Sequence, residues 1–314
     1  MALMTEGRRK THVGDGVLIV KKEIGWTSHD VVAKVRGLLG GAKVGHAGTL
    51  DPAATGVLPL LIGKATRVAE YLVGWDKEYR AVLRLGETTD TQDATGTVLQ
   101  RVETTGVSLE ILDGVVARFR GPQKQVPPMY SAVKVAGRPL YKSARAGETV
   151  DRAERDIVIH ELEVTAIDGR DIGLRVVCSK GTYIRTLCAD MGQALGVGGH
   201  LLSLERTRVG SLAVEQGLTV EQLAAHVTVG SIGAVLLTLD QVLGQLPLVT
   251  VTAEQAVRVL HGTPVGAPRD LPPTESPIRV KDERGRLLAI GAYDGQGRGA
   301  IRIDKVLVDG ESLN

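Results

Sequence analysis

The sequence is poor in cysteine and in aromatic residues, and it has no long apolar run. The two cysteines, Cys178 and Cys188, are too few for a disulfide framework and lack the spacing of metal ligands. The seven histidines show no pair at metal-ligand spacing either. No stretch approaches the roughly 20 apolar residues of a membrane-spanning helix, and the polar, basic N-terminal segment has no secretory signal pattern. We therefore expect a reduced, cytoplasmic protein with no metal, cofactor or membrane partner.

A marked excess of charge of one sign is also missing. The formal net charge is +2, so composition alone does not indicate a nucleic-acid partner, which would require positive charge gathered on one face. A length of 314 residues predicts one large domain with a smaller one beside it. Its 43% hydrophobic and 24% charged residues are typical of an ordinary soluble protein. Because the chain has two Trp, six Tyr and one Phe, its core must be mainly aliphatic, and a tyrosine within a motif is informative.

The most distinctive stretch is GHAGTLDPAATG, residues 45–56. Its glycines permit backbone conformations that other residues avoid, and Pro52 biases Asp51 away from the helical region. Leu50 is a candidate anchor into a core, so this pattern predicts a stiff loop that holds the Asp51 carboxylate in one direction. The same residues also fit an ordinary polar turn, in which Asp51 forms an Asx turn and His46 is merely polar.

This stretch resembles the catalytic motif of the TruB family of tRNA pseudouridine synthases, G-H-x-G-x-L-D-P-x-A-x-G. The resemblance continues in family order through KEYRAVLRLGETTDTQDATG (77–96), PPMYSAVKVAGRPLYKSARAG (127–147), KGTYIRTLCADMGQALG (180–196) and HLLSLERTRVG (200–210). It implies a bacterial-type enzyme that converts uridine-55 in the T-loop of tRNA to pseudouridine. Such a reaction breaks the C1′–N1 bond, turns the base and rejoins it through C5, with no redox step and no net hydrolysis.

The resemblance also implies roles for individual residues. Asp51 is the nucleophile, and Arg185 of the GTYIR string is its ion-pair partner. Tyr79 stacks on the base and serves in proton transfer, Tyr183 lines the pocket, and Leu204 packs under the base. The sequence leaves open whether Tyr183 and Arg185 share one side, since they diverge if a helix has already begun between them.

Further contacts with the RNA are implied around this centre. The target uridine must be turned out of its stack, and His46 is expected to take the vacated space or to contact the extruded nucleotide. Lys22 matches the usual lysine of the family, but Glu23 stands where the family typically has proline, so a solvated Lys22 remains an alternative. The candidates for phosphate contacts are Lys64, Lys43 and Arg67.

The expected fold class is α+β, with a mixed, largely antiparallel sheet flanked by helices and a small β-rich module of PUA type. We expect a flexible tail at 1–14, a catalytic domain at 15–245 and the RNA-binding module at 246–314. Strands are predicted at 16–22, 78–86, 157–167, 172–179, 278–280, 287–292 and 300–308. Helices are predicted after a Ser28 cap, at 65–73, at 108–119 with Ile111 inward, within 180–196, and after capping boxes at 219–222 and 252–255.

The segment at about 123–155 combines basic residues with Tyr130 and Tyr141. Such a mixture suits a surface that follows a phosphate backbone and stacks bases, and the resemblance implies a thumb that grips the T arm. A solvated, salt-bridged excursion is the alternative, because Glu148, Asp151 and Glu154 cancel part of the charge.

Other functions fit parts of the sequence. The chain could bind or fold tRNA without catalysis, or it could be a pseudouridine synthase acting on another RNA. A nucleotide-binding enzyme would use residues 56–66 as a phosphate loop, but this stretch misses the Walker A pattern in loop length and in the residue after the lysine. The favoured hypothesis is a monomeric tRNA-modifying enzyme with no obligate protein partner.

Overall fold

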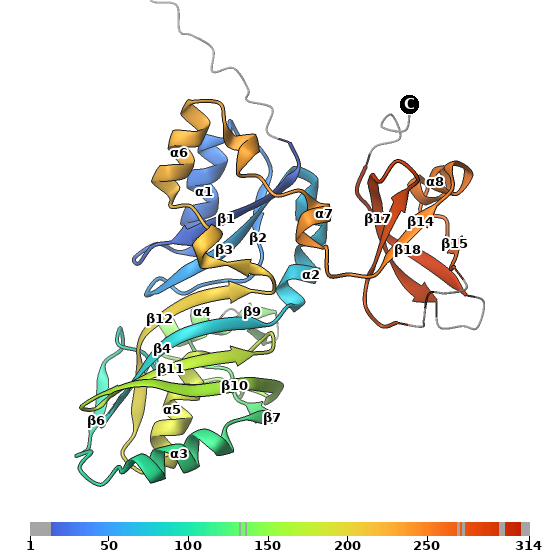
Figure 1. Ribbon diagram of the computed structural model, residues 1–314. Helices are drawn as coiled ribbons and strands as arrows, with labels where there is room; N and C mark the ends of the chain where they lie inside the picture. Colours follow the sequence, from blue (N-terminus) through green and yellow to red (C-terminus); the bar gives the residue numbers. More distant parts are fainter. Residues whose placement is uncertain are drawn as a thin grey trace, which may run out of the picture.

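The computed structural model describes residues 14–131, 133–135, 137–268, 271, 274–294 and 299–308. The predicted tail at 1–14 therefore lies almost entirely outside the described residues. Figure 1 shows a large α+β body and a smaller β-rich unit that follows it in the chain.

The central sheet is mixed and largely antiparallel, as the sequence predicted. Its strands lie in the order β1 (Gly16–Lys22), β3 (Ala54–Ile62), β12 (Gly199–Val209), β4 (Lys77–Leu85), β11 (Asp171–Cys178), β10 (Arg155–Asp168) and β7 (Gly121–Gln125). β2 (Val44–His46) pairs with β3, and β13 (Leu212–Ala213) pairs with β12. The contact between β12 and β3 is parallel, with Leu204 opposite Ala54 and Arg206 opposite Gly56. This pairing brings two segments about half the chain apart to the same point.

Most of the remaining elements connect or cover this sheet, and the last helix packs on the strands of the C-terminal unit. The helices are α1 (Ser28–Leu38), η1 (Gly63–Val68), α2 (Ala69–Gly74), α3 (Leu109–Arg118), α4 (Leu140–Arg145), α5 (Ile184–Ala194), η2 (Val214–Gln216), α6 (Val220–Thr228), η3 (Ile232–Ala234), α7 (Leu239–Val242) and α8 (Ala253–Leu260). The short strands are β5 (Glu87–Thr89), β6 (Val98–Arg101), β8 (Lys134–Val135) and β9 (Arg138–Pro139).

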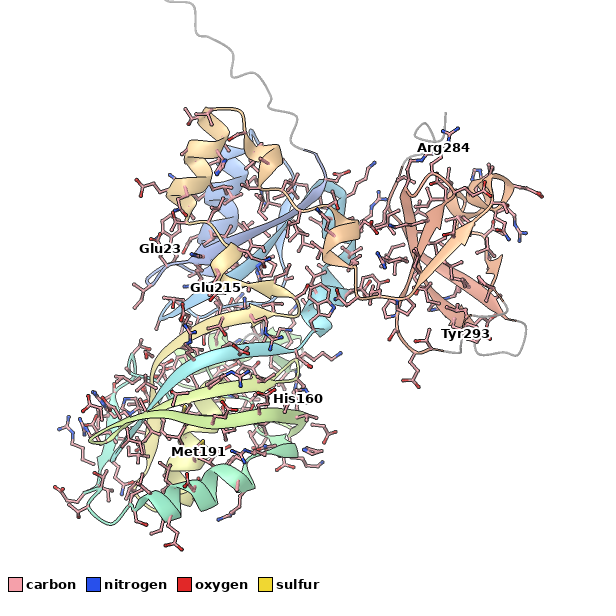
Figure 2. All side chains as sticks on the ribbon, in the orientation of Figure 1. Glu23, His160, Met191, Glu215, Arg284 and Tyr293 are labelled. Carbon is pink, nitrogen blue, oxygen red and sulfur yellow. The ribbon has the colours of Figure 1, made fainter. Side chains whose placement is uncertain are left out.

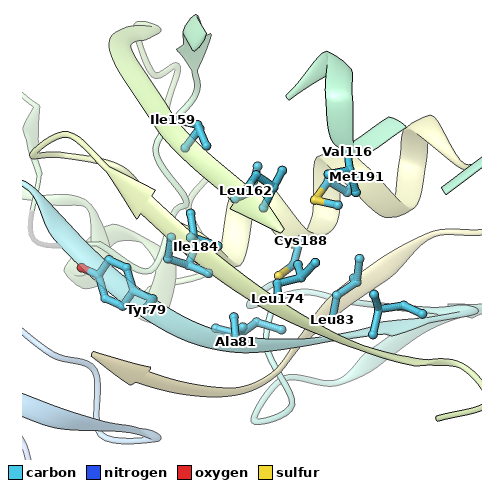
Figure 3. Close-up of a cluster of buried hydrophobic side chains, with 14 of the residues drawn as sticks. Tyr79, Ala81, Leu83, Val116, Ile159, Leu162, Leu174, Ile184, Cys188 and Met191 are labelled. Carbon is cyan, nitrogen blue, oxygen red and sulfur yellow. The ribbon is translucent and has the colours of Figure 1, made fainter. Parts of the chain in front are cut away.

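The core beneath the sheet is aliphatic, as the scarcity of aromatic residues requires. Figure 3 shows part of it, where Val116 of α3 and Cys188 and Met191 of α5 pack with Leu83 of β4 and Leu174 of β11. Apolar burial of this kind stabilises the fold by about 25 cal/mol per Å². It fixes α5, and therefore the residues at the start of α5, against the middle of the sheet.

The two faces of the sheet differ in character. Met191 of α5 is buried against one face, whereas His160 of β10 lies on the opposite face (Figure 2). That opposite face carries alternating charges, for example Arg175, whose guanidinium lies 2.9 Å from Glu78. Because partly exposed ion pairs contribute little stability, apolar packing on the core side of the sheet stabilises the fold more than these charges do.

Two details of the predicted helices were wrong. Ile111 is 48% exposed, because α3 turns Leu112, Val115 and Val116 toward the core at helical spacing. Thr27 rather than Ser28 caps α1, through a capping box with Asp30. The predicted capping boxes of α6 and α8 are present.

The C-terminal unit is β-rich, as predicted, and has its own core. Its strands lie in the order β14 (Leu248–Val251), β16 (Ile278–Asp282), β17 (Leu287–Asp294), β18 (Ala300–Val306) and β15 (Val265–Gly266). It contacts the larger body through Arg279 and Lys281, which bind Asp240 of α7 at 2.9 and 2.6 Å. Its assignment to the PUA type, like the domain boundary at 245, remains a prediction.

Candidate active site

The 45–56 loop, the start of β4, the end of β11, the start of α5 and the middle of β12 enclose a cavity of about 320 Å³. This volume lies at the lower end of the range for small-molecule sites. Five of the predicted site residues line the cavity, namely Asp51, Tyr79, Tyr183, Arg185 and Leu204. The sequence separates these residues widely, so the fold itself assembles the site.

Asp51 and Arg185 form the ion pair at the cavity. Their side chains are 3.0 Å apart at the nearest nitrogen and oxygen, and Arg185 is 7% exposed whereas Asp51 is 46% exposed. The guanidinium also donates to the carbonyls of Thr91 and Tyr130, at 3.1 and 2.7 Å, and lies 3.6 Å from Asp93. A buried charge held by so many partners cannot easily turn away. Arg185 therefore orients the carboxylate while leaving it accessible from the cavity.

The acidity of Asp51 reflects opposing influences. Desolvation raises the pKa of the Asp51 carboxyl above that of an ordinary aspartate, and the nearby charge of Asp93 raises it further. The charges of Arg185 and Lys22 oppose this shift. The carboxylate is thus more basic than one in water, while its pairing with Arg185 favours the ionised form that a nucleophile requires.

Arg206 of β12 holds the loop in shape, although it was not among the predicted site residues. Its fully buried guanidinium donates to the carbonyls of Val57, Gly48 and Thr49 at 2.8, 3.0 and 3.4 Å. A signal was present, since Arg206 follows Leu204 by two residues on a strand and alternate strand residues share a face. This spacing predicts that Arg206 lies on the same face of the strand as the pocket residue Leu204.

Tyr79 of β4 lies between this arginine and the core. Arg206 donates a hydrogen bond to the Tyr79 hydroxyl, while burial raises the pKa of Tyr79 to about 12. In Figure 3 the ring lies at the edge of the apolar cluster and its hydroxyl points away from it. The phenol is therefore neutral at physiological pH and has a fixed orientation.

The helix start decides the question left open for Tyr183 and Arg185. α5 begins at Ile184, and Tyr183 is its N-cap in an extended conformation with φ −101° and ψ 108°. The backbone changes direction between the two residues, yet both side chains reach the same cavity. Gln125 of β7 fixes the turn, because its amide pairs with the Tyr183 backbone N–H and C=O at 2.8 and 3.1 Å.

Comparison with known proteins identifies the family. The profile of the TruB family pseudouridylate synthase N-terminal domain matches residues 36–184, and that of the tRNA pseudouridylate synthase B C-terminal domain matches residues 185–244. The chain belongs to the TruB family of pseudouridine synthases. This confirms the resemblance seen in the sequence and the expected isomerase class.

Relatives and solved structures support the family assignment along nearly the whole chain. The tRNA pseudouridine synthase B of Ectopseudomonas mendocina is 45% identical over 96% of this chain and 98% of its own. That of Ralstonia nicotianae is 44% identical over 96% and 95%. The solved Cbf5-Nop10-Gar1 complex contains a similar chain with a TM-score of 0.75 and 28% identity, covering 95% of this chain and 86% of that one. An H/ACA RNP bound to a substrate RNA containing 2′-deoxyuridine gives a TM-score of 0.71 at 27% identity, covering 93% and 85%.

Lys22 binds the 45–56 loop through its ammonium and does not line the cavity. It is buried, and its ammonium donates to the carbonyls of Ala54 and Pro52 at 2.5 and 3.4 Å, so the alternative of a solvated lysine is wrong. Burial lowers its pKa to about 8. Glu23, in place of the usual proline, points to solvent (Figure 2), and its backbone carbonyl accepts from the same ammonium at 2.9 Å.

His46 and Lys64 lie near the loop but outside the cavity lining. The His46 ring packs edge-on against His29 with centroids 5.5 Å apart, and burial lowers its pKa. Lys64 lies beside Asp15, with 3.9 Å between ammonium and carboxylate.

The 123–155 segment reaches the site through Tyr130, whose carbonyl binds Arg185. Part of its positive charge is used internally, since Arg138 pairs with Glu148 at 2.8 Å and Arg152 donates to the Pro127 carbonyl.

The described residues contain no group of three His, Cys, Asp or Glu placed to hold a metal. Within the same residues, no helix has the length and apolar character to span a membrane.

Proposed function

We propose that this protein isomerises uridine-55 in the T-loop of tRNA to pseudouridine and that Asp51 is its nucleophile. The observation that carries this proposal is the accessible Asp51 carboxylate, held 3.0 Å from the buried Arg185 at the edge of a cavity. The named relatives are tRNA pseudouridine synthases, which favours tRNA as the substrate.

The reaction begins with extrusion of the uridine, which costs roughly a few kcal/mol of stacking and pairing. The base enters the cavity, where Tyr79 stacks on it, Leu204 packs beneath it and Tyr183 lines its edge. His46 occupies the space that the base leaves in the RNA. Lys43, Lys64 and the basic thumb contact phosphates of the T arm. Arg67 donates to the Val306 carbonyl at 2.7 Å and so helps to link the C-terminal unit to the larger body.

The chemical step balances without any cofactor. Asp51 forms a covalent bond with the substrate, the C1′–N1 bond breaks, and the base turns to present C5 to C1′. A C1′–C5 bond forms, the bond between Asp51 and the substrate breaks to release the carboxylate, C5 loses its proton and N1 gains one, so no atom or electron is lost overall. Arg185 keeps the Asp51 carboxylate ionised and aligned before it attacks and stabilises it again when it leaves.

The test is tritium release from tRNA transcripts labelled at uridine C5, in chelator and without added nucleotide. Native protein and the control Asp113→Asn, an exposed change on α3, should release tritium and place pseudouridine at position 55. Asp51→Asn should bind tRNA without release. Turnover by Asp51→Asn would remove Asp51 from its role, and product at another position would assign a different target.

The same assay addresses the rival functions. Bound tRNA with no release by native protein would favour a non-catalytic tRNA-binding or tRNA-folding protein.

We further propose that the protein acts alone as a monomer, although the solved Cbf5 chain is in complex with Nop10 and Gar1. Full activity of the purified chain, together with a monomer mass in sedimentation, would support this.

A further inference from the structure

Lys77, at the start of β4, is a buried cation in the wall of the same cavity. The residue is 7% exposed. Its ammonium donates to the carbonyls of Val73, at 2.6 Å, and Trp75, at the C-terminal end of α2. Since an ammonium has three N–H donors, one donor remains beyond these two described acceptors.

The charges of the residues that line the cavity do not balance. Its described lining contains four ionisable residues of ordinarily fixed charge, Asp51, Lys77, Arg185 and Arg206, which amount to one anion and three cations. Arg185 pairs with Asp51 and also lies 3.6 Å from Asp93, which is outside the lining. The described hydrogen-bond acceptors of Lys77 and Arg206 are uncharged oxygens. The cavity is therefore suited to a ligand that is or becomes negative.

The proposed reaction produces such a ligand. If the C1′–N1 bond breaks with its electron pair on the base, uracil carries a negative charge spread over N1, O2 and O4. If Asp51 first attacks C6, the charge lies on C5 and O4. In either route a carbonyl oxygen of the ring becomes more negative, and a fixed donor aimed at developing charge is an effective catalyst in a water-poor site.

We propose that Lys77 is a further catalytic residue, whose ammonium donates to a carbonyl oxygen of uracil and stabilises the negative charge that forms on the ring. This inference rests on the proposed function. Arg206 is less suited to this role, because three backbone carbonyls and the Tyr79 hydroxyl already occupy most of its N–H donors. Lys77 transfers no proton in this scheme and stays charged throughout.

The groups facing Lys77 determine whether it is charged at neutral pH. They are Arg206 from β12, Cys178 from β11, and Asp76 and Lys180 from the adjoining loops. Burial lowers the pKa of Lys77 to about 8, and the charges of Arg206 and Lys180 act in the same direction. The ammonium is thus mostly protonated at pH 7 and is lost as the pH rises through 8.

The first test compares Lys77→Met with the surface control Lys34→Met on α1. Lys77→Met should lower the single-turnover rate at saturating tRNA by about 100- to 1,000-fold, as removal of one such donor does elsewhere, with tRNA affinity unchanged. Lys34→Met should match native protein. A native rate in Lys77→Met would overturn the inference, and so would a loss explained entirely by weaker tRNA binding or by unfolding.

The second test separates catalysis from folding. The native single-turnover rate should fall as the pH rises through about 8, the pKa of Lys77. Lys77→Arg should keep its activity in that range, because a guanidinium stays protonated. Identical pH profiles would indicate a structural role and refute the proposal. If native protein shows no turnover at any pH, the proposed function itself fails, whereas native turnover with an unaffected Lys77→Met rejects this inference alone.

Discussion

Gly56 closes the 45–56 loop at a point where an added methyl group has no room. Its φ is +103°, a conformation that L-residues rarely adopt. A Cβ built on Gly56 would lie 2.2 Å from the backbone oxygen of Arg206 and 2.7 Å from its nitrogen. Because these atoms belong to the backbone of β12, relief requires that β3 and β12 separate. We therefore predict that Gly56→Ala is strongly destabilising.

The magnitude follows from two contributions. A positive φ costs a non-glycine residue about 1–2 kcal/mol, and overpacking against a fixed neighbour adds about 1–3 kcal/mol. Gly169, in the turn between β10 and β11, is a matched control with φ +58° and no atom within 4 Å of a built Cβ. Gly169→Ala should show the first contribution alone, against a total stability of about 5–15 kcal/mol for a folded domain.

Urea denaturation followed by circular dichroism measures the difference between the two variants. Gly56→Ala should also slow single-turnover catalysis in molecules that remain folded, since moving β12 displaces Arg206 and with it the carbonyls of Gly48 and Thr49. Equal stability of Gly56→Ala and Gly169→Ala would show that the β3–β12 contact adapts readily, and the argument for a rigid loop would then be wrong.

Three further predictions concern the site directly. Arg185→Ala should abolish most turnover while tRNA still binds, because Asp51 loses its partner; an unimpaired single-turnover rate would exclude that ion pair from the mechanism. Turnover should decline as the pH falls, with a midpoint above 3.8, since the active form of Asp51 is ionised and burial raises its pKa; a pH–rate profile with a midpoint at or below 3.8 would contradict this. The affinity for tRNA, measured by filter binding, should fall steeply with added salt because phosphate contacts release counterions, and a flat response would argue against a phosphate-led grip.

Periodicity predicted the sheet well and the helix starts less well. The strand predicted at 78–86 is present as β4, and its alternate residues Tyr79, Ala81 and Leu83 are buried together. The error at Ser28 has a physical cause. Thr27 and Ser28 are both competent caps, and the choice depends on Leu50, whose backbone N–H and C=O bind the Ser28 hydroxyl at 2.9 and 3.1 Å. Such a tertiary contact leaves no local pattern.

The sequence predicted the site residues that belong to a family motif, but it did not predict which hydrophilic residues would be buried around them. Asp51 and Arg185 were found through the family resemblance, whereas their separation of 3.0 Å depends on how α5 packs beneath the sheet. Lys22, Lys77 and Arg206 are hydrophilic residues that usually remain at the surface. The carbonyl groups that bind Lys22 and Arg206 come mainly from the distant 45–57 segment, whereas those that bind Lys77 belong to residues 73 and 75 just before it.

Two of these buried cations, Lys22 and Arg206, are needed by the irregular 45–56 loop. A loop rich in glycine and proline forms few backbone hydrogen bonds of its own, yet its buried carbonyls must find donors. Arg206 serves the carbonyls of residues 48, 49 and 57, Ser28 serves residue 50, and Lys22 serves residues 52 and 54. The backbone N–H of Ala54 binds the Asp51 carbonyl at 3.0 Å. With its main chain satisfied in this way, the loop leaves the Asp51 carboxylate facing the cavity. Lys22 and Arg206 are cations, so the residues that shape the loop of the proposed nucleophile also make its surroundings positive.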